Sequence, residues 1–503
     1  MKKTAAGYRL IIGYLGLFIA FVGIATLLPI AFLAMPYFRS ELSDWYCFAI
    51  PGGSALIVGL ALFLTISRRS KAQLGKFQDS ILLVLVWISA ILISSVPFVI
   101  KGFPFVNAVF EMTSAYATVG LSIFKAADYE LKIFVLYRSI ICFLGGIGLV
   151  LVVTSAISDR YGLKLYIAEG HNDKLMPNLA KSARLMLSIY TGITALGVLL
   201  YYIAGMPVFD AVIHSISAVA TGGFSSRPEG LMAFAGYKNF GLIQLISVLL
   251  MILGAMNFLL HMFIITGKFK KVTRDCEVRL FGVLLLIFIP LFFLAAFAGS
   301  GWKDPVHALT TGSFTFISAL TTTGFTNVSN VFGDVATITN IGEGVIFLIV
   351  IVNIIGGGMG STAGGVKQYR IAVISKSFYW VTNEKLASAN MIYPHYVWRL
   401  GEQKEINQKD TAEAFGYMFI YIIVLFVGAF FISVFDKYTF GASLFEFSNA
   451  LSSTGMSNGI CVNGNFATKW ILILGMLAGR LEILGIYFAI YRITRDIFGK
   501  ETI

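Results

Sequence analysis

The sequence predicts an all-α polytopic membrane protein that is built from four internal repeats. Of its 503 residues, 57% are hydrophobic and only 13% are charged, a composition that soluble domains rarely have. Apolar runs of about 20 residues, long enough to span a bilayer as a helix, recur along the whole chain. A short polar motif that ends in glycine occurs four times, and its first copy is Ser-Ala-Tyr-Ala-Thr-Val-Gly.

The 38 lysines and arginines indicate how the chain is threaded through the membrane. Most of them fall in alternate loops, at Lys2 to Arg9, Arg68 to Lys76, Arg160 to Arg184, Lys268 to Arg279, Lys367 to Lys409 and Arg492 to Lys500. Because cytoplasmic loops carry an excess of Lys and Arg, these loops and both termini are predicted to be cytoplasmic. The net charge of +12 therefore reflects topology first and contact with membrane lipid second, and no nucleic-acid partner is expected.

The four motifs share small and hydroxyl side chains and a final glycine. They are Ser114–Gly120, Ser217–Gly223, Ser318–Gly324 and Asn449–Gly455. A long apolar run and a short segment suited to a half-helix precede each motif, and the long runs are Ile81–Ile100, Ala183–Ala204, Leu280–Ala298 and Phe415–Phe435. Another long run follows each motif: Ile133–Ile157, Phe240–Ile265, Gly342–Met359 and Trp470–Tyr491. The repeating unit is helix, re-entrant half-helix, extended strip and helix.

One extra hairpin, Tyr8–Met35 and Tyr46–Ile66, comes before the first repeat. The total prediction is about ten spanning helices and four half-helices. The domains are expected to be an N-terminal hairpin over 1–76 and pore repeats over 77–181, 182–276, 277–412 and 413–503. Non-helical backbone at membrane depth is tolerated only where it is buried or lines water. The four strips are therefore expected to meet around a central pore.

Such strips suit a monovalent cation. Their backbone carbonyls can replace the hydration shell of the ion, and the negative C-terminal ends of the half-helices face the same point. The alternative is that the Ser/Thr/Gly clusters only pack helices, which four aligned copies disfavour. The predicted binding residues are Thr118, Val119, Gly120, Thr221, Gly222, Gly223, Thr322, Thr323, Gly324, Ser453, Thr454 and Gly455.

A glycine-rich run, Asn353 to Lys367, interrupts the last helix of the third repeat. Its glycines are Gly356, Gly357, Gly358, Gly360, Gly364 and Gly365. No strand precedes the run, and Val366 separates Gly365 from Lys367, so neither a dinucleotide fingerprint nor a P-loop is expected. A glycine run unwinds a helix, which predicts a flexible flap beneath the strips. Close helix packing is the alternative.

Arg480 lies inside an apolar segment, where a guanidinium is costly and usually functional. A structural pair with a carboxylate on a neighbouring helix is the alternative. Arg138 is nearer the outer end of its helix and is predicted to be structural. Glu111 and Glu446 occupy one repeat position and are expected to support the half-helices or shape the outer field rather than to bind ions.

On these motifs the chain resembles the Trk/Ktr/HKT superfamily of potassium transporters and is most similar to the TrkH type. The resemblance implies membrane–pore–membrane repeats, potassium at the filter residues, a loop that obstructs the pore, and Arg480 as an electrostatic barrier that acts with that loop. It also implies a homodimer in the cytoplasmic (inner) membrane and a separate cytosolic, nucleotide-binding RCK-type subunit (TrkA-like), with no nucleotide bound by this chain. In plant relatives serine at the first glycine position accompanies sodium transport, so Gly120 favours potassium.

Three other classes of protein compete with potassium uptake as the function. A sodium-selective or sodium-coupled transporter of the same fold can also use discontinuous helices, and the potassium-binding subunit of an ATP-driven pump would share the four-repeat plan. An enzyme is not expected, because the five histidines are dispersed and the sequence contains neither HExxH nor DDxxD. The four cysteines form no CxxC pair and are expected to be apolar fillers.

Overall fold

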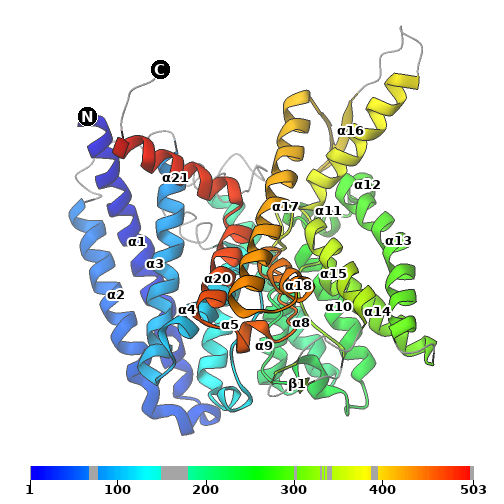
Figure 1. The fold of residues 1–503 in the computed structure, drawn as a ribbon. Helices are drawn as coiled ribbons and strands as arrows, with labels where there is room; N and C mark the ends of the chain where they lie inside the picture. The colour runs from blue at the N-terminus through cyan, green and yellow to red at the C-terminus, as the bar shows by residue number, and fades with distance from the viewer. Residues whose placement is uncertain are drawn as a thin grey trace.

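The computed structural model describes residues 2–66, 77–148, 179–299, 303–328, 331–332, 335–336, 342–386 and 395–498. The predicted inner loop at 68–76, most of the loop at 160–184 and the end of the predicted run 133–157 lie outside these ranges. The described chain is mostly helical (Figure 1). This confirms the predicted all-α class of a polytopic membrane protein.

Six helical segments of the described chain are long and apolar enough to cross a membrane. They comprise α1 (Lys2–Leu33), η1 (Pro36–Asp44) with α2 (Trp45–Ile66), α3 (Gln78–Lys101), α8 (Leu179–Ile203), α13 (Cys276–Gly299) and α17 (Gln408–Asp436). Large apolar side chains on these helices, such as Ile57, Leu286 and Phe419, are exposed on the outside of the molecule. An apolar outer surface of this kind is what a bilayer solvates.

Four short helices point into the middle of the molecule. They are α4 (Phe105–Tyr116), α9 (Val208–Val219), α14 (Pro305–Leu320) and α18 (Phe440–Leu451). Proline stands immediately before or at the first residue of the first three, at Pro104, Pro207 and Pro305, where its fixed φ favours the start of a helix. In α18 the Thr439 hydroxyl caps the helix by accepting from the Ala442 amide at 3.3 Å.

The helices after the four motifs are α5 (Lys132–Ile147), α10 (Phe240–Ala255) with α11 (Phe258–Ile265), α15 (Glu343–Ile355), and α20 (Phe466–Arg480) with α21 (Ile483–Phe498). The apolar runs at 240–265 and 470–491 do not form single straight helices, because α10 and α11 meet at 111° and α20 and α21 at 100°. Asn257 caps α11 at the first break by accepting from the Leu259 amide at 2.8 Å, and Glu482 has a φ of 55° at the second. If each bent pair is one span, the described chain has up to eight spans.

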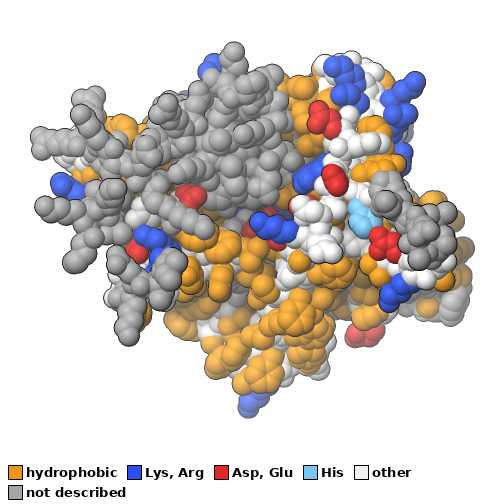
Figure 2. Space-filling model, turned by 90° about the horizontal axis from the view of Figure 1, so that it is seen from above, with side chains coloured by type: hydrophobic (Ala, Val, Ile, Leu, Met, Phe, Trp, Pro, Cys, Tyr) orange, Lys and Arg blue, Asp and Glu red, His pale blue; other side chains and the backbone are white. Residues whose placement is uncertain are grey.

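The remaining elements lie at the two ends of the bundle. They are η3 (Ala126–Glu130), η4 (Gly230–Phe234), α12 (Phe269–Arg274), α16 (Gln368–Leu386), α19 (Ile460–Asn463) and the antiparallel pairs β1 (Val331–Phe332) with β2 (Val335–Ala336) and β3 (Tyr396–Arg399) with β4 (Glu402–Glu405). In Figure 1 the start of α1, the end of α21, α12 and the far end of α16 share one end of the molecule. Figure 2 looks onto this end, where Lys and Arg side chains lie among apolar side chains and a few Asp and Glu side chains.

Candidate functional site

The four short helices end in the same way. The first residue after each cap has a left-handed backbone, with φ of 50° at Thr118, 50° at Thr221, 52° at Thr322 and 60° at Ser453. In each case the next amide returns to a carbonyl five residues back, as in Val119 to Ser114 at 2.9 Å and Thr454 to Asn449 at 2.9 Å. A β-branched threonine in this region costs about 1–3 kcal/mol, so the surroundings must hold it there. The turn converts each helix into an extended strip at one shared depth.

The four motif glycines stand against the backbone of the neighbouring strip. A methyl carbon added at Gly120 would lie 2.5 Å from the Gly222 carbonyl oxygen. Likewise, one at Gly223 would overlap the Thr323 carbonyl, one at Gly324 the Thr454 carbonyl, and one at Gly455 the Val119 carbonyl. These contacts run from the first strip to the second, third and fourth and back to the first. The strips therefore form a closed ring, in chain order, that has no room for side chains at the glycines.

A cavity of about 80 Å³ opens on one side of the ring. All four glycines line it, together with the residues that follow them: Ser122, Phe224, Ser225, Phe325, Thr326, Met456 and Ser457. These hydroxyl groups and the adjoining backbone make the mouth of the ring polar. The predicted filter residues are thus brought together from four separate parts of the sequence.

Polar side chains of the short helices support the strips from behind. Glu111 accepts from the Ser122 hydroxyl at 2.8 Å and from the Ile123 amide at 3.0 Å. Glu446 accepts from the Ser457 hydroxyl at 2.8 Å, and Nε2 of His214 lies 3.1 Å from the Ser225 hydroxyl. In three repeats, therefore, a side chain of the short helix bonds to the hydroxyl two residues after the motif glycine. The two glutamates thus contact the strips as supports, the role that was expected of them.

Arg138 joins the first strip to the second. Its buried guanidinium donates to Glu111 at 2.6 Å, to the Ser122 hydroxyl at 3.0 Å and to the Ser225 carbonyl at 2.8 Å. The rings of Phe124 and Phe224 lie 4.6 Å and 4.5 Å from it, where they favour a cation. This arrangement gives Arg138 a structural part at the back of the ring.

The glycine-rich run forms a loop, residues 356–367, between α15 and α16. All six predicted glycines lie in it, and Gly356, Gly360 and Gly365 have φ between 70° and 82°, which favours glycine. The Gly364 amide donates to the Thr322 hydroxyl at 2.9 Å, and the Thr362 and Thr221 hydroxyls are 3.1 Å apart. The loop therefore touches the residues at which the second and third strips begin, on the side of the ring away from the cavity.

The single hydroxyl hydrogen of Thr362 is shared between two carbonyls of the protein around the loop. The hydroxyl lies 3.1 Å from the Val219 carbonyl at the end of α9 and 2.9 Å from the Gly254 carbonyl in α10. A methyl carbon added at Gly364 would also overlap the Ser452 carbonyl, beside the fourth strip. Across its length the loop is packed against three of the four repeats.

Arg480 is the last residue of α20 and reaches the loop. It donates to the Thr362 carbonyl at 2.8 Å, to the Gly146 carbonyl at 3.3 Å and to the Gly145 carbonyl. Glu482, two residues later, accepts from Arg370 at 2.9 Å and lies 3.8 Å from Lys367. The arginine thus bridges the loop and the end of α5, while the nearby carboxylate binds the basic residues that follow the loop.

Sequence reasoning missed three buried polar residues around the loop. Asn353 accepts from the Thr454 hydroxyl at 3.0 Å, Asn257 donates to the Met359 carbonyl at 2.5 Å, and Glu277 accepts from the Met359 amide at 2.8 Å. The available signal was a polar residue within or beside an apolar run, which is costly unless it has a partner.

Long apolar helices around a ring of backbone carbonyls, with a loop packed beneath the ring, define a multi-pass membrane transport protein. A family model described as "TrkH: Cation transport protein" matches residues 54–494. The chain belongs to this family, which consists of transporters and not enzymes. The predicted resemblance to the Trk-type superfamily is thereby confirmed.

Individual relatives span nearly the same length. The chain is 28% identical over 490 residues to an uncharacterized cation transporter from Methanocaldococcus jannaschii, covering 96% of this chain and 94% of the relative. It is 29% identical over 451 residues to the Trk system potassium uptake protein TrkH of Salmonella typhimurium, covering 85% and 88%. The crystal structure of the potassium transporter TrkH from Vibrio parahaemolyticus superposes with a TM-score of 0.80 at 25% identity, over 95% and 98% of the two chains.

Proposed function

We propose that this protein takes up potassium across the cytoplasmic membrane through a channel-like pore. The observation that carries the proposal is the closed ring of four strips, in which each motif glycine lies against a carbonyl of the next strip. Inward-facing carbonyls at this ring can replace the water molecules around a monovalent cation. Two similar proteins that are named as potassium transport proteins support potassium as the ion.

The filter consists of the backbone at Thr118–Gly120, Thr221–Gly223, Thr322–Gly324 and Ser453–Gly455. Its carbonyls are the ligands, and the glycines keep neighbouring strips close enough to share one ion. The C-terminal ends of α4, α9, α14 and α18 add negative partial charge at the same place. Potassium is the transported ion and occupies the filter during passage.

The loop at residues 356–367 and Arg480 form the gate. The loop bonds to Thr221 and Thr322 at the base of the ring, which supports a position in the ion path. Arg480 adds a fixed positive charge beside it and holds the Thr362 carbonyl. Opening requires the loop to move away from the ring and the arginine to release it.

The protein acts as a homodimer with a cytosolic, nucleotide-binding RCK-type subunit of the TrkA kind. Support for a multi-component system comes from a similar protein named as part of a Trk system. The alternate basic loops favour cytoplasmic termini, so that the gate faces the cytosolic partner. This chain itself binds lipid and potassium and leaves nucleotide binding to the partner.

The test is growth and ion uptake in cells that lack their own potassium uptake systems. Expression of this chain with a TrkA-like partner should restore growth at low potassium and raise potassium uptake well above sodium uptake. Equal or greater sodium uptake would identify a sodium transporter of the same fold instead. Uptake that requires a co-expressed ATPase subunit would identify part of a pump.

A further inference from the structure

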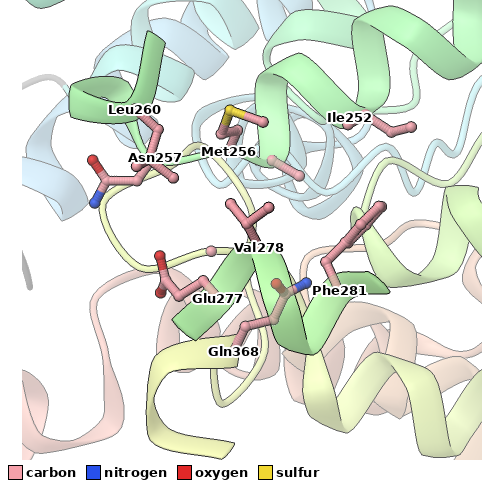
Figure 3. A pocket seen from close by; sticks show the side chains of 10 residues that line it. Ile252, Met256, Asn257, Leu260, Glu277, Val278, Phe281 and Gln368 are labelled. Carbon is pink, nitrogen blue, oxygen red and sulfur yellow. The ribbon is translucent and has the colours of Figure 1, made fainter. Parts of the chain in front are cut away.

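One residue of the loop, Met359, is held by both of its backbone polar groups. Its amide donates to Oε1 of Glu277 at 2.8 Å, and its carbonyl accepts from Nδ2 of Asn257 at 2.5 Å. Glu277 lies in the first turn of α13, and Asn257 lies at the break between α10 and α11. Both side chains are only 3% exposed. Figure 3 shows them on opposite sides of the chain segment that they grip.

The two side chains also border a small space beside the loop. A cavity of about 50 Å³ is lined by Asn257, Glu277, Gly358 and Gln368, among others (Figure 3). A space of this size is larger than the minimum that holds a water molecule. The loop therefore has a polar side chain on each side of Met359 and room next to Gly358.

Glu277 and Met359 also connect to the β3–β4 hairpin. Asp275 accepts from the Glu277 amide at 2.9 Å and from the Leu400 amide, in the hairpin turn, at 2.8 Å. The Met359 side chain packs in one apolar cluster with Cys276, Tyr369 and Val397 of β3. The hairpin, the start of α13 and the loop are thus continuous through bonded and packed groups.

We propose that Glu277 and Asn257 are positioning residues that latch the loop beneath the ring, and that the hairpin is the element whose movement releases them. The effect of the latch on conduction rests on the proposed function. The effect of the latch on the position of the loop does not. A hydrogen bond to a charged group contributes enough to change an equilibrium by about tenfold. Losing the Glu277 side of the latch should therefore raise the population of displaced loop by about tenfold, and losing the neutral Asn257 bond should raise it by less.

Loop position can be measured without reference to ion flux. In a full-length chain whose native cysteines are replaced, Ser361→Cys places a thiol at a buried loop position. Its rate of labelling by a water-soluble maleimide should rise about tenfold with Glu277→Ala, because the amide of Met359 loses its acceptor. Glu277→Gln keeps an acceptor oxygen and should restore slow labelling.

The second side of the latch is tested by Asn257→Ser. Serine is a good N-cap and can keep the start of α11, but it is too short to reach the Met359 carbonyl. Labelling should again be faster, and Asp275→Ala, which frees the hairpin turn, should act in the same direction. Unchanged labelling in both Glu277→Ala and Asn257→Ser, in protein that is correctly folded, would overturn the latch.

Potassium flux then separates the latch from the gate. If both proposals hold, Glu277→Ala raises flux per molecule, and it adds nothing in a chain that lacks residues 359–362. Faster labelling with no change of flux in either background would leave the latch standing and reject the loop as the gate. Higher flux after the deletion but unchanged labelling and flux in Glu277→Ala would reject the latch alone.

A matched control is Glu41, another buried carboxylate that accepts from backbone amides. It binds the Lys132 and Ile133 amides at 3.1 Å and 3.0 Å at the start of α5. Glu41→Ala removes the same kind of bond without touching the loop and should leave the labelling rate unchanged. A rise equal to that of Glu277→Ala would mean general loosening of the protein and would overturn the proposal.

Discussion

The guanidinium of Arg480 lies 2.8 Å from the carbonyl oxygen of Thr362 and donates a hydrogen bond to it. The bond joins the end of α20 to the loop, while the second nitrogen of Arg480 reaches the carbonyls of Gly145 and Gly146 at the end of α5. One residue therefore supplies both a positive charge next to the ring and a physical bridge between the loop and the first repeat.

Arg480→Ala should raise potassium flux per molecule and reduce dependence on the cytosolic partner. At about 4 Å and an effective dielectric constant near 20, a fixed charge repels a potassium ion by on the order of 4 kcal/mol. This would lower ion occupancy by roughly a thousandfold, and water in the pore would weaken the effect. The measurement is potassium uptake divided by the amount of protein in the membrane.

Arg480→Lys separates the two parts that this residue can play. Lysine keeps the charge but lacks the planar fork that reaches two sets of carbonyls at once. Flux is expected to stay near wild type, which assigns the block to charge; flux that rises as far as in Arg480→Ala would assign it to the bridge. Low membrane abundance with unaltered flux per molecule in Arg480→Ala would contradict a role in gating.

Shortening the loop by removing residues 359–362 should also increase flux. The deletion removes Thr362, whose hydroxyl bonds to the Val219 and Gly254 carbonyls, and Met359, which is held on both sides. Less protein then remains beneath the ring to obstruct an ion. Equal or lower flux at matched membrane abundance and thermal stability would show that the loop does not limit conduction.

Gly120→Ser should weaken discrimination between potassium and sodium. The glycine has a φ of 91°, and a side chain would press against the Gly222 carbonyl, so the first and second strips must separate. The measurement is the ratio of potassium to sodium uptake. Gly102→Ser is the matched control, because Gly102 has a φ of 108° but nothing within 4 Å of an added carbon; the same loss of selectivity in that variant would contradict a local effect at the filter.

The sequence was sufficient to predict the class of fold and the position of the four motifs. Hydropathy predicts the membrane spans, and the distribution of charge predicts their topology. A motif such as Ser114–Gly120 consists of consecutive residues, so that its repetition is visible in the sequence. The glycine run at 356–365 was visible for the same reason. Each of these features depends on residues that are close together in the chain.

The breaks at Asn257 and Glu482 and the partners of Met359 were not predictable from the sequence. Hydropathy averaged over the length of a span stays apolar across both breaks, so it does not show where a side-chain cap or one left-handed residue interrupts the helix. Glu277 and Asn257 come from different repeats and reach Met359 only when α10, α13 and the loop are packed. Arg480 is unusual on sequence alone, as a charged residue in an apolar segment, but its carbonyl partners depend on the same packing.

The buried pair of Arg138 and Glu111 should be the most sensitive stabilising contact behind the ring. Their side chains are 0% and 1% exposed and lie 2.6 Å apart, so Arg138→Ala leaves a carboxylate buried without its cation and should cost about 3–5 kcal/mol of stability. The midpoint of thermal unfolding in detergent measures this loss. Adding Glu111→Gln should recover part of it, because the uncompensated charge is removed. The control is Arg227→Ala, whose guanidinium lies 2.9 Å from Asp210 and is 47% exposed although Asp210 is 4% exposed, so that water can take the place of the arginine beside this carboxylate. An equal shift of the midpoint in the two single variants would show that burial of the Arg138 pair adds nothing to its contribution.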